Sequence, residues 1–293
     1  MRKLLVISFL LLLCSGKDVV AQRSWSYKKK FGTEKNTVYF YWGYNREVYT
    51  KSNINFWGPQ YNFTLFHAKA HDRPSGRIGT YFNPSTISVP QFNVRIGWYY
   101  KEHWDWSVGY DHMKYVMTNN QYVVINGVIE GTTSSSLSGT YTDSDGAIQI
   151  KDHDLHYENT NGLNYISAQL TNTGTFFKTK NLKFAIQRRI GAGAGPVVTQ
   201  TDFNWDGTTY HSTQKISGYG MSIHAGVRFD FFRHFFLMSN WSTGFIHMPK
   251  NPTVQHQGQY AKQVFSYARW DLLGGFLFYI RTKNACDTCP DWH

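Results

Sequence analysis

The stretch GVRFDFFRHFFLMSNW, residues 226–241, decides the fold of this chain. Val227 and Phe229 fall on one face of an extended backbone, whereas Arg228 and Asp230 fall on the other. A short charged break follows, and a second apolar run begins directly after it. This pattern predicts two β-strands joined by a tight turn, each with one apolar face and one polar face.

The same alternation recurs along the chain. Short connections join the second and third, fourth and fifth, and sixth and seventh of these segments, and longer ones join the rest. The eight predicted strands are Thr37–Tyr49, Phe92–Tyr100, Trp104–Met117, Leu163–Phe177, a strand from Leu182, Met221–Phe231, Phe235–Met248 and Val264–Arg281.

Short turns at one end and long loops at the other are typical of outer-membrane barrels. We therefore expect an all-β, antiparallel, up-and-down transmembrane β-barrel of eight strands over residues 36–281, with long extracellular loops. Ten strands remain the alternative, if residues 61–70 and 122–129, or part of 146–158, enter the wall.

The apolar faces fit two orientations, because a soluble barrel of the lipocalin type turns the same faces inward. Two observations favour a membrane barrel. Trp98, Trp104 and Trp106 lie beside a turn, as in an interfacial girdle. The polar faces hold glycines and opposed charges, which suit a narrow interior filled by side chains rather than a wide pore. The predicted interior charge network comprises Arg95, Asp111, Arg228, Asp230, Arg269 and Asp271.

The N-terminus has the pattern of a secretory signal peptide. Arg2 and Lys3 precede the apolar run Leu4–Leu13, which is shorter than the roughly 20 residues of a membrane-spanning helix. Cleavage after Ala21 gives a signal peptide at 1–21 and a flexible lead-in at 22–35. Lipoprotein attachment at Cys14 is disfavoured because the preceding residue is large. The expected location is the outer membrane.

The net charge and the cysteines indicate which binding partners to expect. The net charge is +11, of which Arg2, Lys3 and Lys17 against Asp18 contribute +2 in the signal segment. For an exported basic protein we expect contact with outer-membrane lipid and lipopolysaccharide rather than nucleic acid. The C-x-x-C pair in the periplasmic tail, residues 282–293, predicts a local disulfide, and the tail is also a candidate contact for a periplasmic partner. Its cysteines are Cys286 and Cys289. No cofactor is expected.

The chain resembles small outer-membrane β-barrel proteins of Gram-negative bacteria, most closely barrels of Bacteroidota-type bacteria with no established activity. The resemblance covers less than half of the mature chain, and it implies a fold and a location but no reaction. GFLFYIR (275–281) is also similar to the last strand that the barrel-assembly machinery recognises, although twelve residues follow it here. The stretches that carry the resemblance are VYFYWGYNREVYTKSNINF (38–56), YNFTLFHAKAHDRPS (61–75), VGYDHMKYVM (108–117) and YENTNGLNYIS (157–167).

Two polar stretches are candidate sites. In DHDLHYE, residues Asp152, Asp154, His156 and Glu158 share one face of an extended chain, and such ligands suit a divalent cation. One strand cannot close a metal shell, so a solvated loop is the favoured interpretation. In HAKAHDR, residues His67, Lys69, His71 and Arg73 share a parity and suit lipopolysaccharide phosphates, with internal pairing as the favoured alternative.

Three functions remain open, and the favoured one is a structural or surface-interaction role without catalysis. The second is an outer-leaflet lipid-modifying enzyme of the deacylase or acyltransferase type. Ser239, Ser242 and His247 share a predicted strand, but no G-x-S-x-G motif occurs. The third is a narrow channel or small-solute carrier. An inward Ser-His-acid cluster would favour the enzyme, and unpaired lumen charges would favour the channel.

Overall fold

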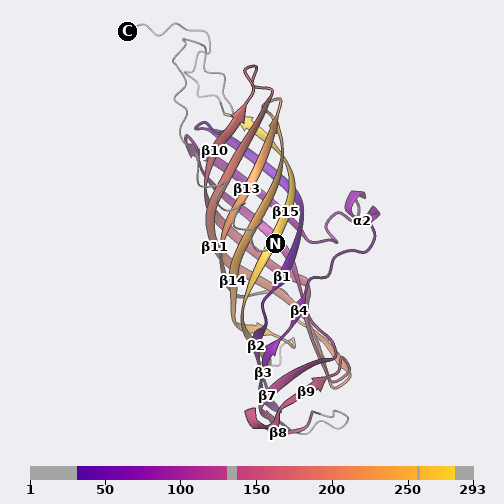
Figure 1. Cartoon of the computed structure of the whole chain (residues 1–293). Coiled ribbons are helices and arrows are strands. Elements are labelled where there is room, and N and C mark those ends of the chain that lie inside the picture. Colours follow the sequence, from indigo (N-terminus) through magenta and orange to yellow (C-terminus); the bar gives the residue numbers. More distant parts are fainter. Residues whose placement is uncertain (1–31, 131–136, 256–257, 281–293) are drawn as a thin grey trace, which may run out of the picture.

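The structure is a computed structural model that describes residues 32–130, 137–255 and 258–280. The predicted signal peptide, most of the lead-in and the tail with Cys286 and Cys289 lie outside the described residues. Eight antiparallel strands form a closed ring, drawn in Figure 1 as a tilted barrel. In ring order they are β1 (Thr37–Tyr49), β5 (Phe92–Lys101), β6 (Trp104–Met117), β10 (Leu155–Lys178), β11 (Phe184–Trp205), β13 (Lys215–Phe231), β14 (Phe235–Pro252) and β15 (Tyr260–Tyr279).

The ring closes where the first strand meets the last. β1 pairs with β15 from Thr37 opposite Tyr279 to Tyr49 opposite Tyr267. Tight turns join β5 to β6, β10 to β11 and β13 to β14 at one end, and the longer segments emerge at the other. The predicted eight-stranded, up-and-down antiparallel barrel is therefore confirmed. The first three predicted strands nearly match the observed bounds, whereas β10 begins earlier than predicted, at Leu155.

The two faces of the ring differ in polarity as a membrane requires. Ile96 and Val108 each expose 57% of their surface on the outside, and Leu237 exposes 56%. Arg95 points inward and exposes 2%. Lipid offers no partner for backbone polar groups, and a closed ring satisfies all of them between strands. The apolar exterior and polar interior are those of a transmembrane barrel.

Small inward residues make room for large ones inside the ring. A Cβ at Gly109 would lie 2.5 Å from the Arg95 guanidinium carbon. At Gly97 it would lie 2.2 Å from the Tyr39 ring. These glycines lie on the polar faces that the alternation identified, and they let bulky side chains cross a narrow lumen.

The long loops extend the same sheet beyond the ring (Figure 1). The β15 end pairs with β2, β2 with β3, β3 with β7, and β7 with both β8 and β9. Residues 61–68 and 122–129 thus lie in strands outside the ring, and residues 155–158 enter the ring only as the start of β10, so the ten-stranded alternative is wrong. These elements are β2 (Ser52–Gly58), β3 (Tyr61–Ala68), β4 (Ala70–His71), β7 (Gln121–Ile129), β8 (Gly139–Tyr141), β9 (Ala147–Ile150), β12 (Thr208–His211), the helix α2 (Gly79–Phe82) and the 3-10 turn η1 (Asp143–Asp145).

We call the sheet of β2, β3, β7, β8 and β9 the extension. It packs against the ends of β10 and β11 that lie opposite the tight turns, across an apolar core. The Phe56 ring lies 5.5 Å from the rings of Tyr157 and Phe203. Among the described residues, no helix has the length and apolar character needed to cross a bilayer.

Candidate functional site

The lumen charges lie in two groups. In the first, Asp111 Oδ2 lies 3.5 Å from Arg95 and 3.2 Å from Arg269. Arg269 Nε is also 2.9 Å from Asp271, and Asn240 donates to Asp271 at 2.8 Å. Each of these four charged side chains is at most 4% exposed, so together they form a desolvated, paired plug across the barrel.

The second group lies nearer the tight turns. Arg228 Nε is 2.8 Å from Asp230, so the six predicted charges separate into four and two. A further pair, which the sequence analysis did not select, is Arg189 and Asp105 at 3.2 Å. Tyr99 links the two ion pairs, because both arginines donate to its hydroxyl, at 2.9 and 3.2 Å.

Beyond the plug, toward the extension, the interior of the barrel becomes apolar. Met113, Tyr115 and Met117 continue the inward face of β6, and none exposes more than 1% of its surface. They join the apolar core shared with the extension. The described lumen is therefore filled by paired charges at one level and by close-packed apolar side chains at the next.

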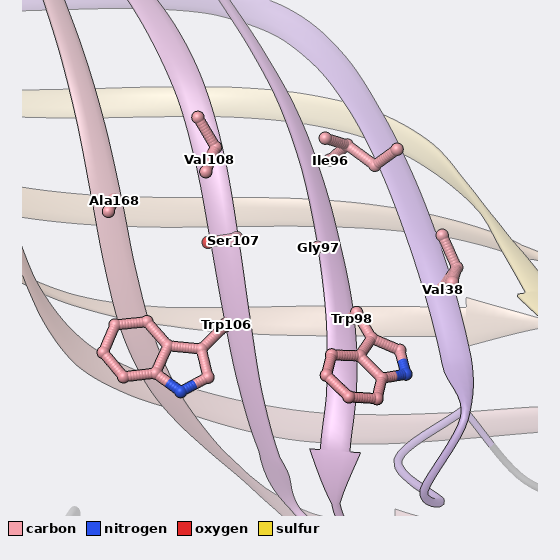
Figure 2. Close-up of a pocket in the computed structure, with 8 residues that line it drawn as sticks. All are labelled: Val38, Ile96, Gly97, Trp98, Trp106, Ser107, Val108 and Ala168. Atoms are coloured by element: carbon pink, nitrogen blue, oxygen red, sulfur yellow. The ribbon is translucent and has the colours of Figure 1, made fainter.

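An apolar hollow of about 280 Å³ lies on the outside of the barrel wall. Figure 2 shows Trp98 and Trp106 side by side on neighbouring strands, with Val38, Ile96 and Val108 beside them. This hollow belongs to the wall that faces lipid, and it contains no exposed charged group. Its aromatic rings lie next to the tight turn between β5 and β6, as an interfacial girdle does.

A polar pocket of about 410 Å³ lies at the extracellular rim. We call it the rim pocket. It is crossed by one row of residues over five strands, since His71 is opposite Val116, Val116 opposite Glu158, Glu158 opposite Asp202, and Asp202 opposite His211. The lining residues are His71, Arg73, Val116, Asn119, Asp152, His156, Glu158, Asp202, Asn204, Thr209 and His211.

The predicted acidic stretch supplies part of this pocket. His156 lies between two carboxylates, with Nδ1 3.0 Å from Asp152 and Nε2 3.1 Å from Glu158. Asp154 is buried in the turn before β10 and does not line the pocket, so the four residues do not share one face. The face is broken because residues 151–154 form a turn, in which the amides of Asp154 and Leu155 both donate to the Lys151 carbonyl. Among the described residues, no three His, Cys, Asp or Glu side chains have the geometry of a metal site.

Glu158 contacts the side chains of Arg73, His156 and Thr160. It lies near the N-terminal end of β10, beyond the lipid-facing part of that strand. Burial raises the pKa of Glu158, but hydrogen bonds from His156 and Thr160 and the charge of Arg73 outweigh burial, so the pKa is lowered. Arg73 approaches Glu158 to 2.9 Å. One pocket thus contains residues of both predicted stretches. They are His71 and Arg73 from HAKAHDR, and Asp152, His156 and Glu158 from DHDLHYE.

The predicted anion-contact set is divided by the backbone. His67 has a left-handed φ of 56°, which breaks the alternation before β3 ends at Ala68. His71 and Arg73 therefore line the rim pocket, whereas His67 lines another hollow with Lys51 and Lys262. The exposed side chain of Lys69 lines neither of these two pockets. The expectation that all four residues share one face is wrong.

Asp202 and His211 were not predicted as site residues, and their Oδ1 and Nδ1 atoms lie 2.7 Å apart. A signal for them was present, because Asp-Gly is a strong marker of a two-residue hairpin. Asp206 and Gly207 adopt φ values of 52° and 76° and turn β11 into β12, which brings His211 opposite Asp202.

The hydroxyl and imidazole groups of β14 do not meet in a catalytic arrangement. Ser242 is buried on the inward face, whereas Ser239 accepts a hydrogen bond from Trp270 on the outward face. His247 lies on the outward face beside the Tyr219 hydroxyl, at 3.1 Å. The alternating directions of a strand therefore separate Ser242 from Ser239 and His247, which share the outward face but lie eight residues apart on β14.

Comparisons with known proteins find outer-membrane proteins of low sequence identity and low TM-score. No protein-family model matches the chain, and no curated protein matches it. The outer membrane protein OprG from Pseudomonas aeruginosa is similar over 85% of this chain and 99% of its own, with 9% identity and a TM-score of 0.38. Neisserial surface protein A covers 83% and 98% at 8% identity and a TM-score of 0.34. The outer membrane protease OmpT from Escherichia coli covers 86% and 100% at 9% identity and a TM-score of 0.36.

Proposed function

We propose that this protein is a non-conducting outer-membrane surface protein that binds a ligand at its extracellular rim and catalyses no reaction. The observation that supports this most directly is the filled lumen, in which four buried arginines form ion pairs with aspartates and an apolar core lies beyond them, toward the extension. An eight-stranded barrel has an interior just wide enough for side chains. The groups that remain accessible for recognition lie outside, in the rim pocket.

The charge of the rim pocket indicates the kind of ligand. It holds three carboxylates, on Asp152, Glu158 and Asp202, and one guanidinium, on Arg73. The carboxylates outnumber the single guanidinium, and the pocket also holds the imidazoles of His71, His156 and His211. A ligand that presents amino or guanidino groups beside hydrogen-bonding groups complements this surface.

The conductance of the folded protein tests the closed lumen. The full mature chain, refolded in lipid and shown to be folded by a heat-dependent gel shift, is incorporated into planar bilayers. We expect no stepwise current. Regular single-channel steps from the folded material would overturn the non-conducting assignment and favour the channel.

Binding of a tri-lysine peptide to protein in zwitterionic vesicles tests the rim pocket. Asp202→Asn and Asp152→Asn should each weaken binding several-fold at low salt, because each removes a negative charge from the pocket. Asp143→Asn is the matched control, since this exposed carboxylate lies in η1 outside the pocket. Equal loss in all three variants would mean that only overall charge matters.

A further inference from the structure

The segment between β4 and β5, residues 72–91, exposes large apolar side chains around α2. We call it the outer loop. Ile78 exposes 78% of its surface, Phe82 80% and Val89 53%. Large apolar side chains exposed together in one loop are candidates for contact with lipid or with another protein.

The outer loop is fastened to the outside of the barrel wall. The Tyr81 ring lies 4.8 Å from the ring of Tyr44, and the Tyr44 hydroxyl donates to the Tyr81 carbonyl. Arg46 donates to the Tyr81 hydroxyl at 2.5 Å. Near the other end of the loop, Lys114 donates to the Val89 carbonyl at 2.8 Å. The middle of the loop and its C-terminal end are therefore tied to outward-facing residues of β1 and β6.

These contacts place the loop at the edge of the lipid-facing belt that lies opposite the tight turns. Tyr44 follows Phe40 and Trp42 on the outward face of β1, and its ring lies 4.5 Å from that of Trp42. On the next strands Phe92 and Tyr110 form another outward aromatic pair, 5.7 Å apart. Figure 1 shows α2 projecting sideways from the barrel, away from the extension.

We propose that the outer loop is an interfacial anchor, in which Ile78 and Phe82 insert into the outer leaflet at the boundary between headgroups and acyl chains. The continuity of the loop with the lipid-facing wall identifies lipid as the occupant. Arg77, exposed next to Ile78, is placed to contact anionic headgroups, as basic residues do beside interfacial segments. The proposal rests on the membrane location in the proposed function, but not on the rim pocket.

Lipid quenching of a fluorescent label tests the anchor. In the mature chain with Cys286→Ser and Cys289→Ser, the variant Phe82→Cys is labelled with an environment-sensitive dye and reconstituted in phosphatidylcholine vesicles. Some vesicles contain lipid brominated near the carbonyl, and others contain lipid brominated near the chain end. Val108→Cys provides a lipid-facing reference, and Thr140→Cys in β8 provides a water-exposed one.

We expect the label at residue 82 to be quenched at least half as strongly as the label at residue 108, and more by shallow bromine than by deep bromine. A residue 82 label that behaves like the residue 140 label would overturn the anchor. Shielding from iodide without quenching by lipid would also overturn it, because protein would then cover the loop. An unquenched label at residue 108 would instead overturn the membrane location itself. If Phe82→Cys shows no heat-dependent gel shift, Ile78→Cys takes its place under the same criteria.

Discussion

The interior of the membrane ring and the interior of the extracellular part are built on opposite chemistry, although the same strands line both. On β6 the inward residues Asp105 and Asp111 lie at the level of the lipid-facing belt. Met113 and Met117 continue the same inward face toward the extension. The outward face changes in the opposite sense, from Val108 in the belt to Lys114 near the rim. The inward and outward alternation of β6 continues while both of its faces change polarity.

The surrounding solvent explains this difference. Lipid around the ring removes the usual penalty for exposed apolar groups, so the polar residues of the strand turn inward, where they are paired. Water surrounds the end of the barrel next to the extension, so the hydrophobic effect acts there, and apolar side chains turn inward to form a core with the extension. The level at which β6 changes polarity therefore indicates where lipid gives way to water.

The largest effect is expected from the lumen plug. Asp111→Ala leaves Arg95 and Arg269 buried without their shared partner, and breaking a buried pair in this way costs about 3–5 kcal/mol. Urea unfolding of the reconstituted protein, followed by tryptophan fluorescence, measures this loss. Asp143→Ala, at an exposed carboxylate in η1, should change stability by less than about 0.5 kcal/mol. A loss below about 1 kcal/mol for Asp111→Ala would show that the plug charges are solvated.

A smaller, more local effect is expected in the extension. Leu65 is fully buried in the apolar core, and Leu65→Ala should remove about 3 kcal/mol from the stability of that region. The hydrogen bonds that close the ring lie between its own eight strands, so we expect the heat-dependent gel shift to persist while proteolysis within β2, β3 and β7 accelerates. Asn62→Ala, at an exposed outward position, is the control. Loss of the gel shift in Leu65→Ala would show that the two regions fold as one unit.

The smallest effect is expected at the rim. The pKa of Glu158 is lowered, so its contribution to stability is fully present above its ordinary value of 4.5 and is lost as the pH falls through the lower, folded value. Because Arg73 is 60% exposed, Glu158→Gln should cost less than about 1 kcal/mol at pH 7. The difference between Glu158→Gln and the original chain should disappear in acid. A difference that grows as the pH falls would contradict the lowered pKa.

Much of the ring was predictable because alternation needs only one strand at a time. The stretch at 226–241 gave both β13 and β14 and the turn between them, since period-two patterning and a charged break are local signals. The upper ends were harder to predict. Residues 155–162 of β10 contain a register shift between Glu158 and Gly162, and such a bulge interrupts the alternation that marks a strand.

The rim pocket was predictable only in fragments. His71, Arg73 and the His156–Glu158 pair were singled out as two separate sites, because nothing local says that β4 lies beside β6 and β6 beside β10. The partition of His67 from His71 depended on one left-handed residue, a conformation that histidine adopts seldom and that alternation does not report.

The sequence by itself determined that strands alternate, that their polar faces carry opposed charges, and that tight turns and long segments follow one another. These are properties of neighbouring residues, and backbone geometry converts them directly into faces. Only the tertiary structure decided which arginine meets which aspartate, that the long segments form an extension rather than two more wall strands, and that one inward face passes from a charged plug to an apolar core. Those outcomes depend on register between distant strands and on where lipid gives way to water, and neither is a property of any single stretch of the chain.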